Sequence, residues 1–382
     1  MNVAIDIRSL ASPSPSGVGH YVLEVLLAMT REDHPEFLLW STGTEKPTLP
    51  DAILQDPKMK LVHIYTPNKL INLGITLGLV TLEQILNQSV DVAWFPNTGF
   101  LPATEARTVL TVHDLAFHFM PDTYTPIDHL RYRITRSRGA IFTADHIIAI
   151  SQSTANDVVS SFRRSRKNIS VIHHGISSSF KPEYEIADDQ VRTSHAITKP
   201  YILSLATLEP RKNLASLVEA FTKLRERGHD IQLVLAGGPG WLRQDLDSAI
   251  AASPYINDIK IIGYIKDSER PGLIRGAQCM ALPSRYEGFG MQIVEAMACG
   301  TPVVTSRNSS LSEIAGDAAV YVRAMNVNEL TNAIETVLQD HSLKLRLRAR
   351  GLSRAQDFRW SNTAKKTLAA LGKIGITLKN KK

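Results

Sequence analysis

The sequence has little cysteine and no long apolar run. Only two of its 382 residues are cysteines, Cys279 and Cys299, and both stand among apolar neighbours. Isolated thiols of this kind are typical of reduced core residues in a cytosolic protein, so neither a disulfide nor a cysteine-bound metal is expected. The longest uncharged apolar stretch, Leu70–Leu82, has 13 residues. It is too short to cross a bilayer, which takes about 20 residues.

Other absences narrow the class of protein. Met1 leads directly into the strand-like NVAIDIRSL, without the charged segment and apolar core of a signal peptide, so we expect a cytoplasmic protein. No nucleic-acid motif is present, so nucleic acid is not an expected partner. The net charge is +6, and basic residues gather at 129–138 and 344–354. Each cluster is either a solvated helix face or a surface that attracts phosphorylated substrates or an acidic membrane.

Short apolar runs rich in β-formers alternate with amphipathic helical patterns along the chain. Such alternation is typical of parallel sheets covered by helices on both faces. The polar, proline-bracketed segment 180–200 favours an interdomain linker. We therefore predict an α/β fold with two doubly wound, Rossmann-like domains that face a cleft. The expected domains are 1–185 and 198–357, with a C-terminal helix over 358–382 that can pack back on the first domain. The expected strands are Val3–Ile7, Phe37–Trp40, Leu61–Ile64, Val92–Phe95, Thr108–Val112, His146–Ile150, Ser170–Ile172, Tyr201–Leu205, Gln232–Ala236, Lys260–Ile262, Cys279–Leu282, Pro302–Thr305 and Ala319–Val322.

The stretch SRYEGFGMQIVEAMACGTPVV, residues 284–304, places two glutamates around a Gly-Phe-Gly. Because the glycines break a helix, we expect Glu287 in a loop and Glu295 about one turn inside a helix that starts near Met291. The helix N-terminus and the glycine amides favour a phosphate. The two carboxylates can then each bind hydroxyls at one end of an elongated ligand with an anionic centre. A nucleotide diphospho-sugar has this form. The alternative is a surface glutamate next to a capped helix, with the glycines as a plain turn.

Two cations follow the first strand of the second domain. Arg211 and Lys212 stand in LATLEPRKNL at the strand-to-helix turn, and Asn213 is a plausible N-cap. Cations at the carboxyl edge of a sheet can neutralise a diphosphate, although they are also common on an exposed turn.

The first domain offers weaker signals. Gly17 and Gly19 open the first helix after a Pro- and Ser-rich loop, either as a ligand-approaching turn or as an ordinary one. His113 ends a strand in TVLTVHDLAF, where it either points into the cleft or is bonded within the fold. Asp245 and Asp247 lie about 200° apart on an expected helix, so no metal site is predicted there.

Taken in order, these motifs resemble those of the retaining glycosyltransferases of family four, also called glycosyl transferases group 1. The motifs are the glycine-rich first loop, HD after a mid-domain strand, EPRKN, GY after a strand, and E-GFGMQIV-E with AMACGTPVV. The resemblance covers nearly the whole chain and is nearest to mannosyltransferase-like bacterial members that build surface polysaccharides. It implies the GT-B fold, transfer of a hexose from a nucleotide diphospho-sugar to a saccharide or lipid-linked acceptor, and no metal or other cofactor.

The resemblance also implies roles for single residues. Glu287 would hold hydroxyls of the transferred sugar and Glu295 the ribose hydroxyls. Lys212, assisted by Arg211, would bind the diphosphate. His113 would approach the donor sugar.

Further positions in the same motifs would act mainly through the backbone. The peptide groups of Phe289, Gly290 and Met291 would contact sugar and phosphate, and that of Tyr264 would contact the base. Gly17 and Gly19 would line the diphosphate or acceptor side.

The sequence departs from the family pattern at two places. Many relatives carry an arginine just after the first strand of the second domain, where this chain has Ala206-Thr207, so the positive charge rests more on Arg211 and Lys212. The frequent NGVD is here HGIS, at residues 174–177, which leaves the role of that loop open.

Several alternatives stay open on the sequence alone. GDP-mannose is the favoured donor, and UDP-sugars come next. Other functions are a nucleotide-sugar epimerase, an inactive binding subunit of the same fold, or a nicotinamide dehydrogenase, the last disfavoured by the missing glycine fingerprint. Residues 70–82 form either a core helix or a surface that meets a lipid-linked acceptor, and with the basic segment 129–138 they allow shallow membrane contact.

Overall fold

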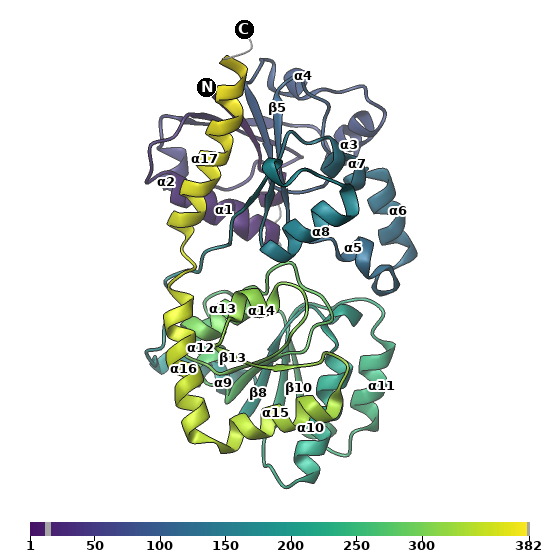
Figure 1. Ribbon diagram of the computed structural model, residues 1–382, viewed down its shortest axis with the longest axis vertical. Coiled ribbons are helices and arrows are strands. Elements are labelled where there is room, and N and C mark those ends of the chain that lie inside the picture. Colours follow the sequence, from purple (N-terminus) through teal and green to yellow (C-terminus); the bar gives the residue numbers. More distant parts are fainter. Residues whose placement is uncertain (12–16, 380–382) are drawn as a thin grey trace. The chain divides into compact units, whose positions relative to one another are not determined.

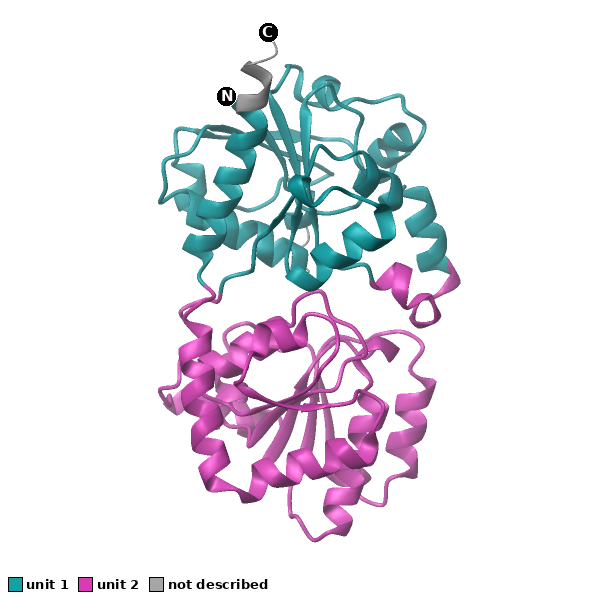
Figure 2. Cartoon of the chain, viewed as in Figure 1, with its two compact units in different colours: residues 1–115, 127–175, 359–382 teal, residues 116–126, 176–358 magenta. Residues whose placement is uncertain are grey.

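The structure is a computed structural model that describes residues 1–11 and 17–379, with side chains described as far as residue 375. It divides the chain into two compact units (Figure 2). Unit 1 comprises residues 1–115, 127–175 and 359–382, and unit 2 comprises residues 116–126 and 176–358. Each unit contains one parallel sheet with helices on both faces (Figure 1).

Unit 1 has a seven-stranded sheet in the order β3-β2-β1-β4-β5-β6-β7, and every neighbouring pair is parallel. Its strands are β1 (Asn2–Asp6), β2 (Glu36–Thr42), β3 (Met59–Ile64), β4 (Val92–Phe95), β5 (Arg107–Val112), β6 (His146–Ala149) and β7 (Ile169–Val171). Its helices are α1 (Gly17–Met29), α2 (Asp51–Leu54), α3 (Asn68–Thr76), α4 (Leu82–Leu86), α6 (Pro126–Ile134), α7 (Ser137–Thr143), α8 (Gln152–Phe162) and α17 (Trp360–Lys379).

Unit 2 has a six-stranded parallel sheet in the order β10-β9-β8-β11-β12-β13. Its strands are β8 (Tyr201–Leu205), β9 (Gln232–Ala236), β10 (Ile259–Gly263), β11 (Cys279–Leu282), β12 (Val303–Ser306) and β13 (Ala319–Val322). Its helices are α5 (Ala116–Phe119), α9 (Ile186–Ser194), α10 (Leu214–Glu226), α11 (Gln244–Ala252), α12 (Arg270–Arg275), α13 (Met291–Ala298), α14 (Leu311–Ala315), α15 (Val327–Gln339) and α16 (His341–Ala355).

The fold-class prediction of two doubly wound parallel sheets is confirmed. Each of the thirteen expected strands is present, and no strand end lies more than two residues from its expected place. The central strands are buried along their whole length, as β4 and β8 illustrate, because helices cover both faces of each sheet. Cys279 and Cys299 are free and buried, as expected, and burial raises the pKa of each thiol to about 12.

Strand order reverses once in each sheet. In unit 1 the chain winds outward in both directions from the neighbouring strands β1 and β4, and in unit 2 from β8 and β11. At such a switch point the loops leave the carboxyl ends of two adjacent strands toward opposite faces, so a crevice opens between them where ligands bind. The topology therefore defines one candidate binding position in each unit.

The polar segment 180–200 is not the linker that its composition suggested. It contains helix α9, which packs on α12 within unit 2. Buried Asp188 on α9 accepts two hydrogen bonds from the Arg275 guanidinium, at 2.7 and 2.6 Å. After the separate stretch 116–126, the chain passes into unit 2 at residue 176, which is before this segment begins. Polar composition misled because the exposed face of a short helix is as polar as a linker.

Helix α17 packs against α1 in unit 1 (Figure 1). Trp360 at its start stacks on His174, with ring centroids 5.8 Å apart, and the Thr363 hydroxyl donates to the His173 carbonyl at 2.7 Å. Gly175 passes directly beneath Trp360, where an added Cβ would lie 2.1 Å from the Trp360 nitrogen. The segment HGIS, residues 174–177, thus provides contacts that hold the last helix, α17, in place.

The apolar stretch Leu70–Leu82 is not a core helix. Helix α3 covers most of it and has no buried residue. Four leucines of the stretch, Leu70, Leu73, Leu77 and Leu79, are 55–69% exposed, and only its last residue, Leu82, is buried. The surface interpretation of this stretch therefore agrees with the structure.

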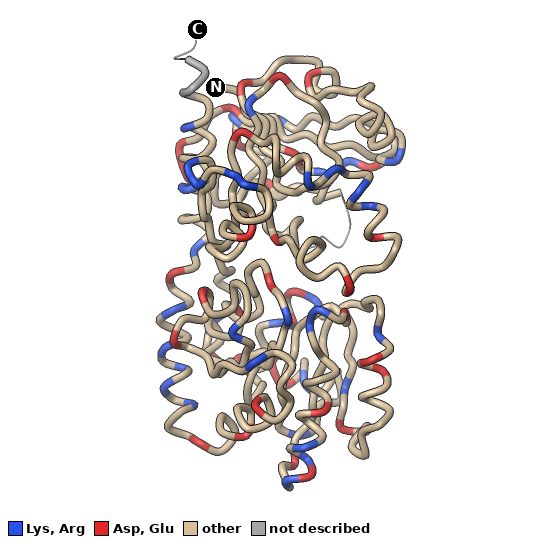
Figure 3. The backbone as a smooth tube through the Cα atoms, turned by 45° about the vertical axis from the view of Figure 1, so that its right-hand side comes forward, with Lys and Arg blue, Asp and Glu red and all other residues tan. Residues whose placement is uncertain are grey.

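Basic and acidic residues are distributed along the chain as Figure 3 shows, and the two basic clusters differ in the contacts of their side chains. On α16, Arg348 donates to the Gly300 carbonyl and Arg354 to the carbonyls of Ile314 and Glu313, so these side chains hold α16 against its neighbours. On and after α6, Arg131, Arg133 and Arg136 are exposed. The second cluster is a solvated basic surface, whereas the first combines these structural contacts with exposed arginines such as Arg346.

A glycine substitution tests the docking of α17. We expect Gly175→Ala to lower the free energy of unfolding of unit 1 by about 2–4 kcal/mol, because the new methyl group must displace Trp360. Gly372→Ala, on α17 itself, is the matched control, since nothing lies within 4 Å of its Cβ. It should raise stability by about 0.5–1 kcal/mol. Thermal and urea unfolding measure the stability of both variants. Equal changes in the free energy of unfolding for Gly175→Ala and Gly372→Ala would contradict the assigned role of Gly175.

Candidate active site

The loops at the switch point of unit 2 bring Glu287, Lys212 and Arg211 together. Strand β8 leads into the short 3-10 turn Pro210–Lys212, and β11 leads into the loop that carries Glu287. The Lys212 ammonium donates to Glu287 Oε1 at 2.7 Å, and Arg211 Nη1 donates to Oε2 at 3.1 Å. All three side chains are largely buried. The carboxylate and the two expected diphosphate-binding cations therefore form one contiguous cluster.

The electrostatics of the cluster keep Glu287 ionised. Burial by itself would raise the pKa of Glu287, but attraction to Lys212 and Arg211 outweighs it. Hydrogen bonds from Lys212 and from the Ser284 hydroxyl, the latter at 2.7 Å, act in the same direction. Together they lower the pKa to about 2. Arg211 also donates to Glu209 at 2.5 Å, so two cations face two carboxylates.

The loop around Glu287 is fixed by side-chain bonds to its backbone. The Ser310 hydroxyl donates to the carbonyls of Glu287 and Phe289 at 2.9 and 3.0 Å, and the Glu287 amide donates to Ser309 Oγ at 2.8 Å. Such bonds hold the carboxylate in place before a ligand arrives, which lowers the cost of binding.

Asn213 stands at the start of α10 but does not cap it as expected. Its backbone is left-handed, with φ 55°, and its side chain makes no cap bond. Its amide group instead donates to the carbonyls of Pro283 and Ala324, at 3.1 and 2.5 Å, and its Oδ1 accepts from Ser216. Asn213 therefore ties together the loops that follow β8, β11 and β13.

Two glycines allow the loops to pack this closely. Gly290 precedes α13 with φ 94°, and a Cβ there would lie 2.9 Å from Leu311. Gly237, after β9, has φ 154°, and its Cβ would lie 2.0 Å from the carbonyl oxygen of Ala206. Any other residue would force apart the backbone around the site.

Glu295 lies one turn inside α13, as expected, and is buried. Its Oε1 accepts a hydrogen bond from Arg270 at the start of α12, and Arg270 also pairs with Asp267 at 3.2 Å. Burial would lower the pKa of Arg270, but the two carboxylates raise it. A pocket of about 170 Å³ lies beside this pair, at the ends of β8, β9 and β10, and its lining includes Tyr264 and Gln292.

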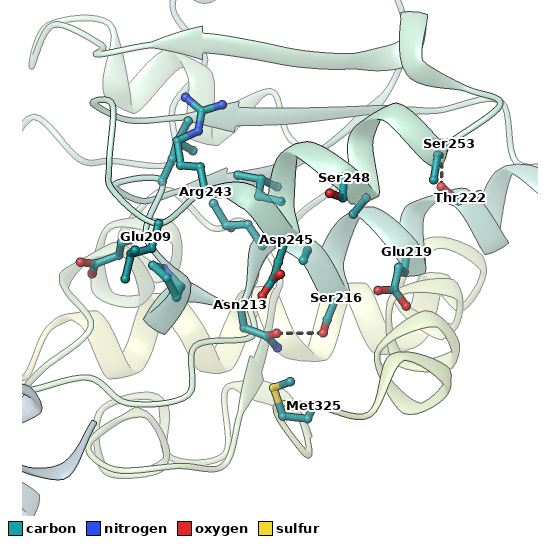
Figure 4. A pocket seen from close by; sticks show the side chains of 18 of the residues that line it. Glu209, Asn213, Ser216, Glu219, Thr222, Arg243, Asp245, Ser248, Ser253 and Met325 are labelled. Atoms are coloured by element: carbon teal, nitrogen blue, oxygen red, sulfur yellow. Dashed lines mark hydrogen bonds between the residues drawn. The ribbon is translucent and has the colours of Figure 1, made fainter. Parts of the chain in front are cut away.

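A larger groove of about 770 Å³ lies between α10 and α11 (Figure 4). It borders the cluster through Glu209 and Asn213, but much of its wall is helix surface that carries acidic side chains such as Glu219 and Asp245. Its lining has four acidic and three basic side chains, so the groove has no excess of positive charge to attract a diphosphate.

The remaining expected residues of unit 2 occupy different environments. The Phe289 side chain is buried and packs edge-on against Phe358, with centroids 5.8 Å apart, so only its backbone is available to a ligand. Met291 begins α13, next to the first amides of the helix. Tyr264 is largely exposed and lines the smaller pocket. Asp247 pairs with Arg243 at 2.7 Å, and across the described residues no group of His, Cys, Asp and Glu side chains is arranged to hold a metal.

In unit 1, His113 follows β5 at the carboxyl edge of the sheet. Its Nε2 lies 2.8 Å from the Pro96 carbonyl oxygen. A carbonyl can only accept, so Nε2 carries the proton. Burial lowers the pKa of His113, which keeps the ring neutral and leaves Nδ1 as the acceptor. Gly17 is exposed at the first position of α1 and Gly19 is buried, while the loop residues 12–16 before them lie outside the described residues.

Sequence reasoning did not identify Arg270, Ser284, Ser309 and Ser310 as parts of the site. Serines gave no signal because their role depends on a loop from another part of the chain. Arg270 stands six residues after the Gly-Tyr motif at the start of a helix, and only the fold brings it to Glu295.

The comparisons with known proteins agree with this arrangement. Residues 187–354 match the family described as "Glycosyl transferases group 1", and residues 15–180 match "Glycosyltransferase Family 4". The O-antigen chain mannosyltransferase B of Escherichia coli is 32% identical over 273 residues, which is 71% of each chain. The chain belongs to the group 1 glycosyltransferases.

Other relatives of this glycosyltransferase are more distant. The serotype-specific mannosyltransferase WbdA of Escherichia coli is 27% identical over 68% of this chain, but that match covers only 32% of WbdA. Among solved structures, sucrose-phosphate synthase from Thermosynechococcus elongatus has a TM-score of 0.75 at 19% identity and covers 100% of both chains. WaaG, a glycosyltransferase of lipopolysaccharide biosynthesis, has a TM-score of 0.73 at 14% identity, covering 97% of this chain and 99% of its own. These structures support the GT-B fold.

The shifted pKa of Glu287 predicts a pH dependence of stability. The pKa is 4.5 for an unperturbed glutamate and about 2 here. The stabilisation is fully present above pH 4.5 and is lost as the pH falls through the folded value near 2. At about 1.4 kcal/mol per pH unit, this amounts to about 3 kcal/mol.

We therefore expect the wild type to lose about 3 kcal/mol more than Glu287→Gln between pH 6 and pH 2. Urea unfolding at each pH measures the difference. Glu226→Gln, at an exposed position on α10, is the control and should keep the wild-type slope. A Glu287→Gln slope equal to that of the wild type would contradict the assigned pKa.

Proposed function

We propose that the protein is a retaining mannosyltransferase. It moves mannose from a nucleoside diphosphate-mannose to a saccharide or lipid-linked acceptor in the synthesis of a bacterial surface polysaccharide. The observation that carries this proposal is the contact of Glu287 with Lys212 and Arg211 at the switch point of unit 2. The mannosyl specificity is supported by the two relatives reported above, which are both named mannosyltransferases.

The cluster suits the departure of a nucleoside diphosphate. When the sugar–phosphate bond breaks, negative charge grows on the phosphate oxygen. Lys212 and Arg211, already held in place by carboxylates, and the first amides of α13 stabilise that charge. Glu287 then accepts hydrogen bonds from the sugar hydroxyls, and Glu295, oriented by Arg270, accepts those of the ribose.

Retention of configuration follows from front-face attack in this proposal. Glu287 is engaged by two cations and a serine, so its lone pairs are poorly placed for nucleophilic attack on the anomeric carbon. A phosphate oxygen of the leaving group takes the acceptor proton instead. His113, neutral and with an acceptor Nδ1, accepts a sugar hydroxyl. A covalent glycosyl adduct trapped on Glu287 would refute this order of events.

The donor in this proposal is GDP-mannose, with UDP-sugars as the next candidates. The backbone of Tyr264, in the pocket of about 170 Å³, meets the base, and the peptide groups of Phe289, Gly290 and Met291 meet sugar and phosphate. Gly17 and Gly19 line the diphosphate or acceptor side. No metal or other cofactor takes part in these steps. An epimerase or an inactive subunit on the same fold remains the alternative, and an epimerase would change its donor in the absence of an acceptor.

Donor binding and transfer test the proposal together. GDP should raise the melting temperature more than UDP, dTDP or ADP, because a ligand that binds only the folded protein stabilises it. Glu295→Ala should raise the KM for GDP-mannose roughly 10- to 100-fold, since it removes charge-assisted hydrogen bonds to the ribose. Glu226→Ala is the matched control. NMR of the product should show that its new glycosidic bond has the same anomeric configuration as the donor.

Failure of every nucleotide to shift the melting temperature would count against the donor site. Donor isomerised without acceptor would instead indicate an epimerase, and donor binding without transfer or hydrolysis would indicate an inactive subunit.

We also propose that unit 1 touches the inner face of the cytoplasmic membrane. Helices α3, α7 and α6 follow one another along one side of unit 1 (Figure 1). The leucines exposed on α3 are accompanied by exposed Ile127 and Leu130 on α6 and by the basic side chains that follow. Apolar groups next to arginines suit the interface of an anionic bilayer. In the described part of the chain, no helix is both long and apolar enough to cross a membrane.

Liposome binding tests this contact. Replacing Arg131, Arg133 and Arg136 together by Ala should weaken binding to vesicles that contain anionic lipid by roughly 100-fold, at about 1 kcal/mol per arginine. The control replaces Lys365, Lys366 and Lys373 on α17, which lies on another side of the same unit (Figure 1). Equal losses in the two variants would indicate only a general effect of net charge, and unchanged binding would contradict the contact.

A further inference from the structure

Unit 1 has a pocket of its own at its switch point. The pocket has a volume of about 230 Å³. Asp6, the last residue of β1, and Pro96 and Asn97, directly after β4, form part of its wall. Because β1 and β4 are the neighbours from which the sheet winds in opposite directions, this is the position in unit 1 where an open α/β sheet binds ligands.

In three asparagines of this pocket, the amide oxygen already accepts a hydrogen bond. The Asn72 oxygen accepts from the Arg8 guanidinium at 3.3 Å, and the Asn97 oxygen accepts from the Thr98 amide at 2.7 Å. The Asn68 oxygen accepts from the Thr42 hydroxyl. Since each oxygen is engaged by a donor, the NH₂ end of each amide is fixed. None of these NH₂ groups has a hydrogen-bond partner among the described residues.

The pocket has no net positive charge to attract an anion. Its one cation, Arg8, is paired with Asp6 by contacts of 2.6–3.2 Å. The Arg8 guanidinium lies over the Trp40 ring, 4.5 Å from its centroid, and donates to the Phe100 carbonyl. Arg8 is therefore held in place, and its hydrogen bond orients the Asn72 amide. Each of the three nitrogens of this guanidinium already donates to an oxygen of the protein, so Arg8 has little donor capacity left for a phosphate.

The remaining lining suits a small polyol. The Ser9 hydroxyl is buried at the pocket, and it has no hydrogen-bond partner among the described residues. Phe100 lines the same pocket and is partly exposed, which offers an apolar surface to the C–H face of a sugar ring. The volume is below the roughly 300–1,000 Å³ of pockets for drug-sized ligands, so one sugar ring fits better than an oligosaccharide.

We propose that this pocket is the subsite for the terminal, uncharged sugar of the acceptor, recognised by the amides of Asn68, Asn72 and Asn97. The inference rests on the proposed function and names the acceptor-binding residues. It also gives α3 two roles, because Asn68 and Asn72 lie one turn apart on that helix and line the pocket, whereas Leu70 and Leu73 on the same helix are exposed. His113 adjoins the pocket through its bond to the Pro96 carbonyl.

The test uses the full chain and methyl α-mannoside as the probe. Saturation-transfer NMR measures its binding, and initial rates with GDP-mannose measure its KM as an acceptor. Asn97→Ala and Asn72→Ala should each raise the dissociation constant and the KM about tenfold, as expected for loss of a neutral hydrogen bond. The double variant should lose detectable binding. The control is Asn156→Ala, which removes an exposed amide from α8 in the same unit.

The outcomes separate this subsite from the donor site. The proposal is supported if mannoside binding is lost while the melting shift with GDP is kept, which also demonstrates that the variants fold. It is overturned if the wild type gives no mannoside signal, if the asparagine variants bind mannoside as the wild type does, or if inorganic phosphate competes for the pocket. Absence of a shift with every nucleotide tested would refute the proposed donor site, whereas the mannoside measurement would still decide on the pocket.

Discussion

A buried carboxylate held between two cations is the constraint on which the site in unit 2 depends. Ionised Glu287 is stable in the interior only because Lys212, Arg211 and Ser284 surround it. Removing one partner of such a cluster leaves an uncompensated buried charge, which costs about 3–5 kcal/mol. The loops after β8 and β11 are therefore locked to each other by electrostatics, and Asn213, Ser309 and Ser310 hold the backbone that the charges require. A diphosphate that binds here meets cations whose positions are already set.

The same topology is used twice with different chemistry. Each sheet has one switch point, and in each unit polar side chains gather at it. In unit 2 the polar groups are charged and suit a diphosphate. In unit 1 the one cation is neutralised by Asp6, and neutral amides remain. The two switch points therefore suit different ligands, a diphosphate met by cationic donors in unit 2 and a neutral polyol met by amide donors in unit 1.

Much of the fold could be predicted from the sequence because strands buried on both faces have a distinctive composition. The strands and the placement of Glu287 and Glu295 relative to α13 followed from local patterns. Local patterns could not predict the side-chain partners that the fold brings to the site from distant parts of the chain. Arg270 for Glu295, the serines around Glu287 and the amides of Asn68, Asn72 and Asn97 depend on tertiary contacts. The exposed leucines of α3 and the helix α9 were harder still, because an apolar run does not reveal whether it is covered and a polar segment does not reveal whether it is helical.

The most direct measurement is a crystal structure of the chain with GDP-mannose or a non-hydrolysable analogue. The account predicts phosphate oxygens within about 3 Å of the Lys212 ammonium and the Arg211 guanidinium, Glu287 on the sugar hydroxyls and Glu295 on the ribose. A nucleotide bound elsewhere, for example in the groove between α10 and α11, would contradict it. So would a bound donor with either glutamate turned away from it.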